Sequence, residues 1–123
     1  MGRGDVLIDA NNVRRSRWPN LLPEEVVKAC SAWAMTADRH AHVIFDGAPP
    51  EPAAAGQSGS CTVLGARGES ADDVIARLAA ELEAAGQPYE LVTSDRELRQ
   101  RAGAGATRIM GGGTFLRGVL GLT

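Results

Sequence analysis

The stretch VLIDANN, residues 6–12, determines how the rest of the sequence is interpreted. Its first three residues form a short, continuous apolar run with β-branched side chains, which is typical of a strand buried on both faces of a sheet. The run ends at Asp9 and is followed by the polar residues Asn11 and Asn12. The stretch therefore predicts a buried strand that places an aspartate at one edge of a sheet.

The rest of the chain alternates short apolar runs with amphipathic segments. Apolar residues spaced by three and four follow Pro23, and Ser70 has an acidic residue three positions on, as at a helix N-terminus. The expected elements are a helix over about 23–39, a strand over 43–45, a weak strand over 61–64, a helix from Ser70 to Gly86, a strand over 89–92, a helix that Ser94 and Glu97 begin and that ends near 102, a strand over 107–110 and a helix over 114–120. This alternation predicts an α/β fold with three layers, α/β/α, and a mostly parallel central sheet.

Three connecting segments have no clear period. Residues 13–22 contain several arginines and are expected to form a basic loop. Residues 47–60 are rich in Pro, Ala, Gly and Ser and are expected to form a mobile loop over one end of the sheet. The three glycines at 111–113 are expected to form a tight turn. Within the basic loop, Trp18 is expected either to stack on a base or to pack as a lid.

Length and composition favour a single domain over residues 1–123, with 44% hydrophobic and 23% charged residues. The formal charge of −2 gives no global positive field, so a nucleic acid would have to be bound by a local patch. No apolar run approaches the ~18 residues of a membrane span, and the first residues lack the apolar stretch of a signal peptide. We therefore expect a cytoplasmic protein with no membrane association. Cys30 and Cys61 have no C-x-x-C spacing, so they are expected to be reduced, buried thiols.

Aspartates gather where the expected strands end. Asp9 and Asp46 end their strands, and Asp95 follows a third. Ligand sites of parallel sheets lie beyond the carboxyl ends of the strands, so these side chains are expected at one edge. Asp72 lies in the first turn of the long helix, beside its apolar face, whereas Asp73 points away from the core and is expected to cap the helix.

Carboxylates that lie close together repel one another unless a cation lies between them. All-oxygen ligation with retained water suits Mg²⁺ or Mn²⁺, which support hydrolysis of phosphodiesters. The arginines next to these acids are expected to bind the phosphate backbone of the substrate. They are Arg14, Arg15 and Arg17 after the first strand, and Arg96 and Arg99 after Asp95.

Four motifs in this order, LIDANN, VIFDG, SADDVIARLA and TSDREL, resemble the NYN domain of the PIN-like nuclease superfamily, and in particular its YacP-type branch. They are spread over about residues 5–116. The resemblance implies a PIN-like fold and a metal-dependent ribonuclease. Endonucleolytic cleavage is the expected mode, and the sequence leaves exonucleolytic cleavage open. It implies that the catalytic and metal-binding acids are Asp9, Asp72 and Asp95 with Asp46 nearby, and that Asn12 and Ser94 support substrate binding.

The chain departs from the pattern of this superfamily in two respects. It is shorter than many YacP-type proteins, and the C-terminal acidic position that some PIN domains use has no match after Asp95. The metal would then be bound weakly, or its site would be completed by Asp46 or by the substrate. RNA is the expected partner and the ribosome a further one, while the sequence leaves the oligomeric state open.

Other functions account for the residues less well. A catalytically silent RNA-binding or ribosome-associated module on the same fold is the main alternative. A phosphatase of the haloacid dehalogenase type needs a second acid where the chain has Asn11, and a catalytic lysine where it has only Lys28 inside a helix. His40 and His42 form an H-x-H pair, which could suggest a zinc site. They precede the second strand, however, so they are expected at the edge opposite Asp46 and in structural roles.

Overall fold

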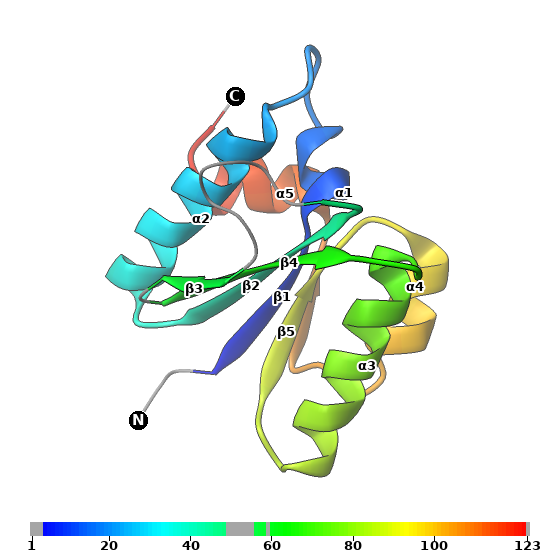
Figure 1. Ribbon diagram of the computed structural model, residues 1–123. Helices are drawn as coiled ribbons and strands as arrows, with labels where there is room; N and C mark the ends of the chain where they lie inside the picture. Colours follow the sequence, from blue (N-terminus) through cyan, green and yellow to red (C-terminus); the bar gives the residue numbers. More distant parts are fainter. Residues whose placement is uncertain (1–3, 49–55, 59, 123) are drawn as a thin grey trace.

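The computed structural model describes residues 4–48, 56–58 and 60–122 (Figure 1). Along the chain its elements are β1 (Asp5–Asp9), α1 (Ala10–Arg14), α2 (Pro23–Ala37), β2 (His40–Asp46), β3 (Gly56–Ser58), β4 (Cys61–Ala66), α3 (Ala71–Ala84), β5 (Tyr89–Val92), α4 (Arg96–Ala102), β6 (Arg108–Met110), α5 (Gly112–Thr114) and the π-helical turn η1 (Phe115–Val119). The sheet has the order β3-β4-β2-β1-β5-β6. All neighbours are parallel except β3, which pairs antiparallel with β4. The expected α/β class with a mostly parallel sheet is confirmed.

The sheet is buried on both faces because β1 and its neighbours direct apolar side chains to each side. Val6 and Ile8 pack into one core with α2 and η1, while Leu7 packs into a second core with α3 and α4. Figure 1 shows α1, α2 and α5 on one side of the sheet and α3 and α4 on the other. The continuous apolar run of β1 is thereby explained, since alternate residues of a strand point to opposite faces.

The backbone differs from expectation in the first connecting segment. Residues 13–22 are not irregular throughout, because α1 follows β1 directly and continues to Arg14. The Asp9 carboxylate accepts a hydrogen bond from the Asn12 amide at 3.4 Å and caps this helix. A single helical turn of five residues is too short to produce a recognisable apolar period, so the sequence pattern did not indicate it.

Two further segments also differ from expectation. Residues 49–55 and 59 of the expected mobile loop lie outside the described residues, but Gly56–Ser58 form the edge strand β3. The prediction of a loop was wrong for these three residues, since their strand is defined by pairing with Cys61–Val63. The last helical segment begins at Gly112, so two of the three glycines expected in a turn are helical.

Cys30 and Cys61 are buried and free, as the sequence predicts. Trp33 is half-buried and packs edge to face against Phe115, with 5.3 Å between ring centroids. Among the described residues, no helix combines the length and the apolar character needed to cross a bilayer.

A polar link joins α1, the β5–α4 connection and α5 at the edge where the parallel strands end. The Ser94 amide donates to Asn12 Oδ1 at 3.0 Å, and the Gly112 amide donates to Ser94 Oγ at 3.0 Å. A Cβ atom at residue 112 would lie 2.3 Å from Asn12 Oδ1 and 2.9 Å from Ser16 Oγ. A Cβ at this position would displace Asn12 or Ser16, so glycine favours the close approach of the three segments.

Gly112→Ala is expected to lower the free energy of unfolding by about 1–3 kcal/mol, because the methyl group displaces Asn12 from its bond to Ser94. The matched control is Gly118→Ala, since a Cβ there meets nothing within 4 Å. That change should leave stability equal or slightly higher. Urea denaturation of the three proteins measures both effects, and equal stability of the two variants would contradict the steric argument.

Candidate active site

A cavity of about 220 Å³ lies at the edge where the parallel strands end. Strands β1 and β2, the start of α3 and the β5–α4 connection all contribute to it. Its lining residues are Asp9, Asn11, Asn12, Arg15, Asp46, Ser70, Asp72 and Asp95. The four aspartates expected at this edge thus face one cavity, and Arg15 is the one basic side chain among the described residues that line it.

Asp9 is the most deeply buried of these acids, with 8% of its surface exposed. Ile8 of β1 pairs with Val92 of β5, so the residues that follow them lie side by side. Thr93 is completely buried, and its hydroxyl group donates a hydrogen bond to Asp9 Oδ2 at 2.9 Å. The same hydroxyl accepts a hydrogen bond from the Asp95 amide at 3.1 Å. Thr93 therefore orients Asp9 and the start of the α4 segment together.

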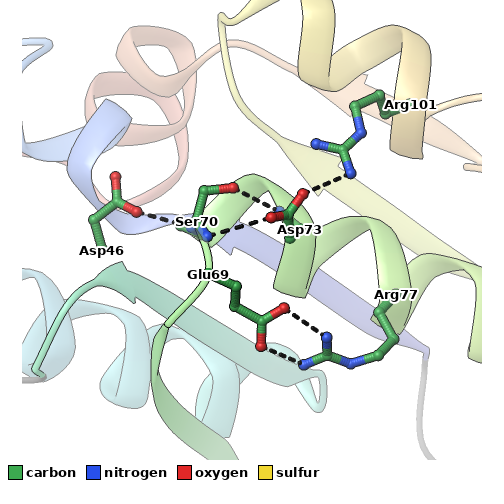
Figure 2. A network of polar contacts seen from close by, with 7 residues as sticks. Asp46, Glu69, Ser70, Asp73, Arg77 and Arg101 are labelled. Carbon is green, nitrogen blue, oxygen red and sulfur yellow. Dashed lines mark hydrogen bonds and ion pairs between the residues drawn. The ribbon is translucent and has the colours of Figure 1, made fainter. Parts of the chain in front are cut away.

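Asp72 lies in the first turn of α3, and several contacts hold that turn in place (Figure 2). Ser70 is the N-cap, with its hydroxyl accepting from the Asp73 amide at 3.1 Å. Asp46 Oδ1 accepts from the Ala71 amide at 2.8 Å. On the side that faces α4, Arg101 pairs with Asp73 at 2.9 Å. Asp73 Oδ2 accepts from the Ser70 amide at 3.4 Å, so Asp73 completes a capping box with Ser70, as expected, and Asp46 contributes to the same helix start.

Asp95, not Ser94, caps α4. Its Oδ1 accepts from the Leu98 amide at 2.9 Å. The expected capping box of Ser94 and Glu97 was wrong because the Ser94 hydroxyl bonds instead to the Gly112 amide. The cap therefore lies one residue further along the chain, and it brings the Asp95 carboxylate to the cavity.

Burial and mutual repulsion disfavour the charge of two of these acids. Burial raises the pKa of Asp9, the Thr93 hydroxyl and the Asn12 amide counteract this, and the charges of Asp72 and Asp46 raise it further. Burial also raises the pKa of Asp72, with the Asp95 charge adding to the effect and Arg101 opposing it. A cation in the cavity would relieve both effects.

The oxygen-rich lining fits a hard divalent cation that retains part of its water shell. Carboxylate and amide oxygens are the donors that Mg²⁺ and Mn²⁺ prefer, and Mg²⁺ is usually held by one or two carboxylates together with water. Within the described residues, however, no three His, Cys, Asp or Glu side chains are placed so that they could hold an ion directly. The lining therefore fits a hydrated ion better than an ion stripped of its water.

The arginines expected to bind substrate are placed very differently from one another. Arg15 lines the cavity. Arg14 is half-buried and donates from Nε to the Leu21 carbonyl at 2.9 Å, so its guanidinium group stabilises the connection between α1 and α2. Arg99 likewise donates to the Thr93 carbonyl at 2.8 Å. Arg17 donates to the Pro19 carbonyl at 3.1 Å, and Arg96 is exposed at the start of α4, outside the cavity lining.

Asn12 lines the cavity and Ser94 does not, and the polar atoms of both side chains link backbone segments. Asn12 Oδ1 and the Ser94 hydroxyl both accept backbone hydrogen bonds. Sequence reasoning did not assign Thr93 or Arg101 to the site. The one local signal for Thr93 is that it directly follows the apolar run of β5, at the strand end where ligand sites of parallel sheets lie. Arg101 has no such signal, because its partner Asp73 lies 28 residues away.

His40 and His42 lie at the opposite end of the sheet, as expected. His42 Nε2 lies 2.8 Å from Asp5 Oδ1, and His40 Nε2 lies 2.7 Å from Thr62 Oγ1. Their ring centroids are 4.5 Å apart. Each imidazole is therefore engaged with a neighbouring strand and does not contribute to the acidic cavity.

Solved structures share this fold. Rae1 (YacP) from Bacillus subtilis, in a single-site mutant form, is 22% identical with a TM-score of 0.71, over 97% of this chain and 75% of that chain. The unmutated Rae1 structure is 19% identical with a TM-score of 0.72, over 93% and 72% of the two chains. A mutant of the T5 5'-exonuclease is 17% identical with a TM-score of 0.54, over 86% and 49%.

No protein-family model and no curated protein matches the chain. At such low identities the likeness to solved structures shows the fold alone. The chain therefore shares the fold of Rae1 (YacP), which agrees with the fold that the YacP-type resemblance of the motifs predicted.

Asp9→Asn is expected to raise the thermal unfolding midpoint at neutral pH in EDTA. The folded-state pKa of Asp9 is raised, so the stability linked to its neutral form is lost as the pH rises through that pKa. Asparagine stays neutral, and its oxygen can accept from the Asn12 amide while its NH2 group donates to the Thr93 hydroxyl oxygen. The gain should therefore shrink as the pH falls toward the ordinary value of 3.8.

Asp73→Asn is the control variant, for which we expect a shift of the thermal unfolding midpoint in the opposite direction. The hydrogen bond with Arg101 lowers the pKa of Asp73, so its charge stabilises the fold above the ordinary pKa and this contribution is lost on acidification. Its removal should lower the midpoint at neutral pH. Melting curves of both variants across pH measure the two signs, and a lower midpoint for Asp9→Asn would contradict the electrostatic account.

Proposed function

We propose that the protein is a divalent-metal-dependent ribonuclease that hydrolyses phosphodiester bonds of RNA at the acidic cavity. The single observation that carries this proposal is the convergence of Asp9, Asp46, Asp72 and Asp95 on one cavity of about 220 Å³ at the edge where parallel strands end. Ligand sites of such sheets lie at this edge. The shared fold with the T5 5'-exonuclease supports the same reaction class.

The four acids differ in their contacts and burial. Asp9, Asp46 and Asp95 each have one carboxylate oxygen bound to a helix amide, whereas Asp72 has no such bond among the described residues. Burial raises the pKa of Asp9 and of Asp72, so these are the carboxylates whose charge a cation would stabilise most. We propose Asp9 and Asp72 as the residues that hold Mg²⁺ or Mn²⁺, with Asp95 and Asp46 completing the set through water or directly.

When bound, the cation supplies charge stabilisation for a phosphodiester and for the water that attacks it. The protein's own residues then orient the reactants. Thr93 fixes the Asp9 carboxylate, while Asp72 faces the cavity beside the free space that the substrate enters. Arg15 is the residue that we propose binds a phosphate oxygen, because it is the basic residue among those that line the cavity.

A catalytically silent RNA-binding module is the second candidate. One observation favours it: no three ligating side chains of the described residues are placed to hold an ion directly. The two functions differ in one outcome, since a binding module retains RNA without producing fragments whether or not metal is added. The cytoplasmic location, the ribosome as a partner and the single domain over residues 1–123 remain proposals that rest on sequence and resemblance.

RNA cleavage with Mn²⁺ or Mg²⁺ is the direct test. A labelled circular RNA that is opened in the presence of metal, but not in EDTA, identifies endonucleolytic cleavage because a circle has no ends. Asp72→Asn is expected to reduce the rate at least about a hundredfold, since it removes a charge at the cavity. Asp73→Asn, one residue on and outside the cavity lining, should change it less than about twofold. Intact circles with bound protein under all conditions would favour the silent module.

Thr93→Val tests how Asp9 is positioned. The substitution keeps the volume but removes the hydroxyl that donates to Asp9 and accepts from Asp95. By analogy with other groups that orient metal ligands, the Mn²⁺ concentration for half-maximal cleavage is expected to rise about 10- to 100-fold. Thr93→Ser should restore most of the affinity. An unchanged metal dependence in Thr93→Val would remove Asp9 from the proposed metal ligands.

A further inference from the structure

Trp18 is an exposed aromatic side chain in the connection between α1 and α2. Its side chain and backbone are 87% exposed, whereas Leu21, three residues on, is 1% exposed. Figure 1 shows this connection standing out from the body of the molecule above α1. A packing lid would have to cover apolar neighbours and would itself be buried, so the exposure of Trp18 leaves stacking on a ligand as the remaining expectation.

The connection around Trp18 is braced by hydrogen bonds at its base. The Ser16 hydroxyl donates to the Asn12 carbonyl at 2.7 Å, and the Leu21 amide donates to the Arg14 carbonyl at 3.2 Å. Arg117 of η1 donates to the Ser16 carbonyl at 3.4 Å. The indole is therefore presented to solvent by a loop whose two ends are fixed, which lowers the entropy lost when a ligand stacks on it.

Trp18 is also only three residues along the chain from Arg15, which lines the acidic cavity. Arg15 borders the cavity, and three residues span at most about 11 Å even when fully extended. Arg15, Arg17 and Arg117 place positive charge on or beside this connection. A phosphate backbone that passes Arg15 at the cavity would therefore bring a neighbouring base within reach of the indole.

We propose that Trp18 is a stacking platform for an unpaired base of single-stranded RNA, next to the phosphodiester at the acidic cavity. The inference deepens the proposed ribonuclease function and rests on it. Every base has a flat π-face, so stacking on Trp18 is tolerant of sequence. Bases inside a duplex are already stacked and paired, so the platform selects single strands. Arginines flanking one exposed aromatic suit a phosphate backbone with bases, because guanidinium forks match phosphate oxygens.

Binding of RNA in EDTA tests the platform without cleavage. A fluorescently labelled single-stranded RNA is titrated with the wild type, Trp18→Ala, Trp18→Phe and the control Met35→Ala, which alters another exposed apolar residue, 73% exposed, on α2. Trp18→Ala is expected to raise the Kd about 5- to 100-fold. Trp18→Phe should retain most of the affinity, and Met35→Ala should lie within about twofold of the wild type.

Two further ligands distinguish the contribution of base stacking to the affinity from that of electrostatic attraction. For a blunt duplex of the same sequence, and for inorganic polyphosphate, the wild type and Trp18→Ala should have the same Kd. Equal affinity of these two proteins for the single strand, or no binding of the single strand by the wild type, overturns the proposal. So does a variant that loses affinity for all three ligands alike, since that reports a general change of the surface and not base stacking.

The outcomes also distinguish failure of this inference from failure of the proposed function. If the wild type cleaves RNA with Mn²⁺ and Trp18→Ala does so with unchanged KM and kcat, the ribonuclease stands and the platform falls. If no protein cleaves RNA but single-strand binding depends on Trp18, the platform stands and the ribonuclease falls. Loss of ribosome association in Trp18→Ala with unchanged RNA binding would assign the indole to a macromolecular contact and overturn the platform.

Discussion

The buried carboxylate of Asp9 is the constraint on which the rest of the site depends. An aspartate that is only 8% exposed must be protonated or have its charge compensated by nearby groups. Thr93 supplies one hydrogen bond and the first turn of α1 supplies another, while the charges of Asp72 and Asp46 act against them. The fold therefore holds negative charge at a position where burial disfavours it, which is the condition that a cation would relieve.

Helix starts account for much of the acidity at this edge. Asp9 caps α1, Asp46 binds the first amide of α3, and Asp95 caps α4. Carboxylates at such positions satisfy backbone donors and interact favourably with the helix dipole. Asp72 differs, since within the described part of the chain none of the helix amides binds its carboxylate. Its presence at the cavity is thus not explained by helix formation, which makes it the acid most indicative of function.

Local signals in the sequence predicted the positions of these aspartates, but not the contacts between them. A strand that ends in an acid, or a serine followed by one, is recognisable within a few residues. The bond from Thr93 to Asp9 joins residues 84 positions apart and arises only because β5 pairs with β1. Ser94 looked like a helix cap because its hydroxyl's partner, Gly112, is 18 residues away. Strand order decides such contacts, and no short pattern encodes it.

The separation of the acids also bears on how metal and RNA would bind. A carboxylate has two oxygens, so Asp46 and Asp95 can cap a helix with one and still face a ligand with the other. What the described residues lack is three ligating groups close together, so oxygens from water or from a phosphate must complete the coordination of an ion. If substrate phosphate supplies them, metal and RNA increase each other's affinity by the same factor. The cavity would then bind its ion weakly alone and firmly in the complex with substrate, so the phosphate would supply ligands that the described side chains lack.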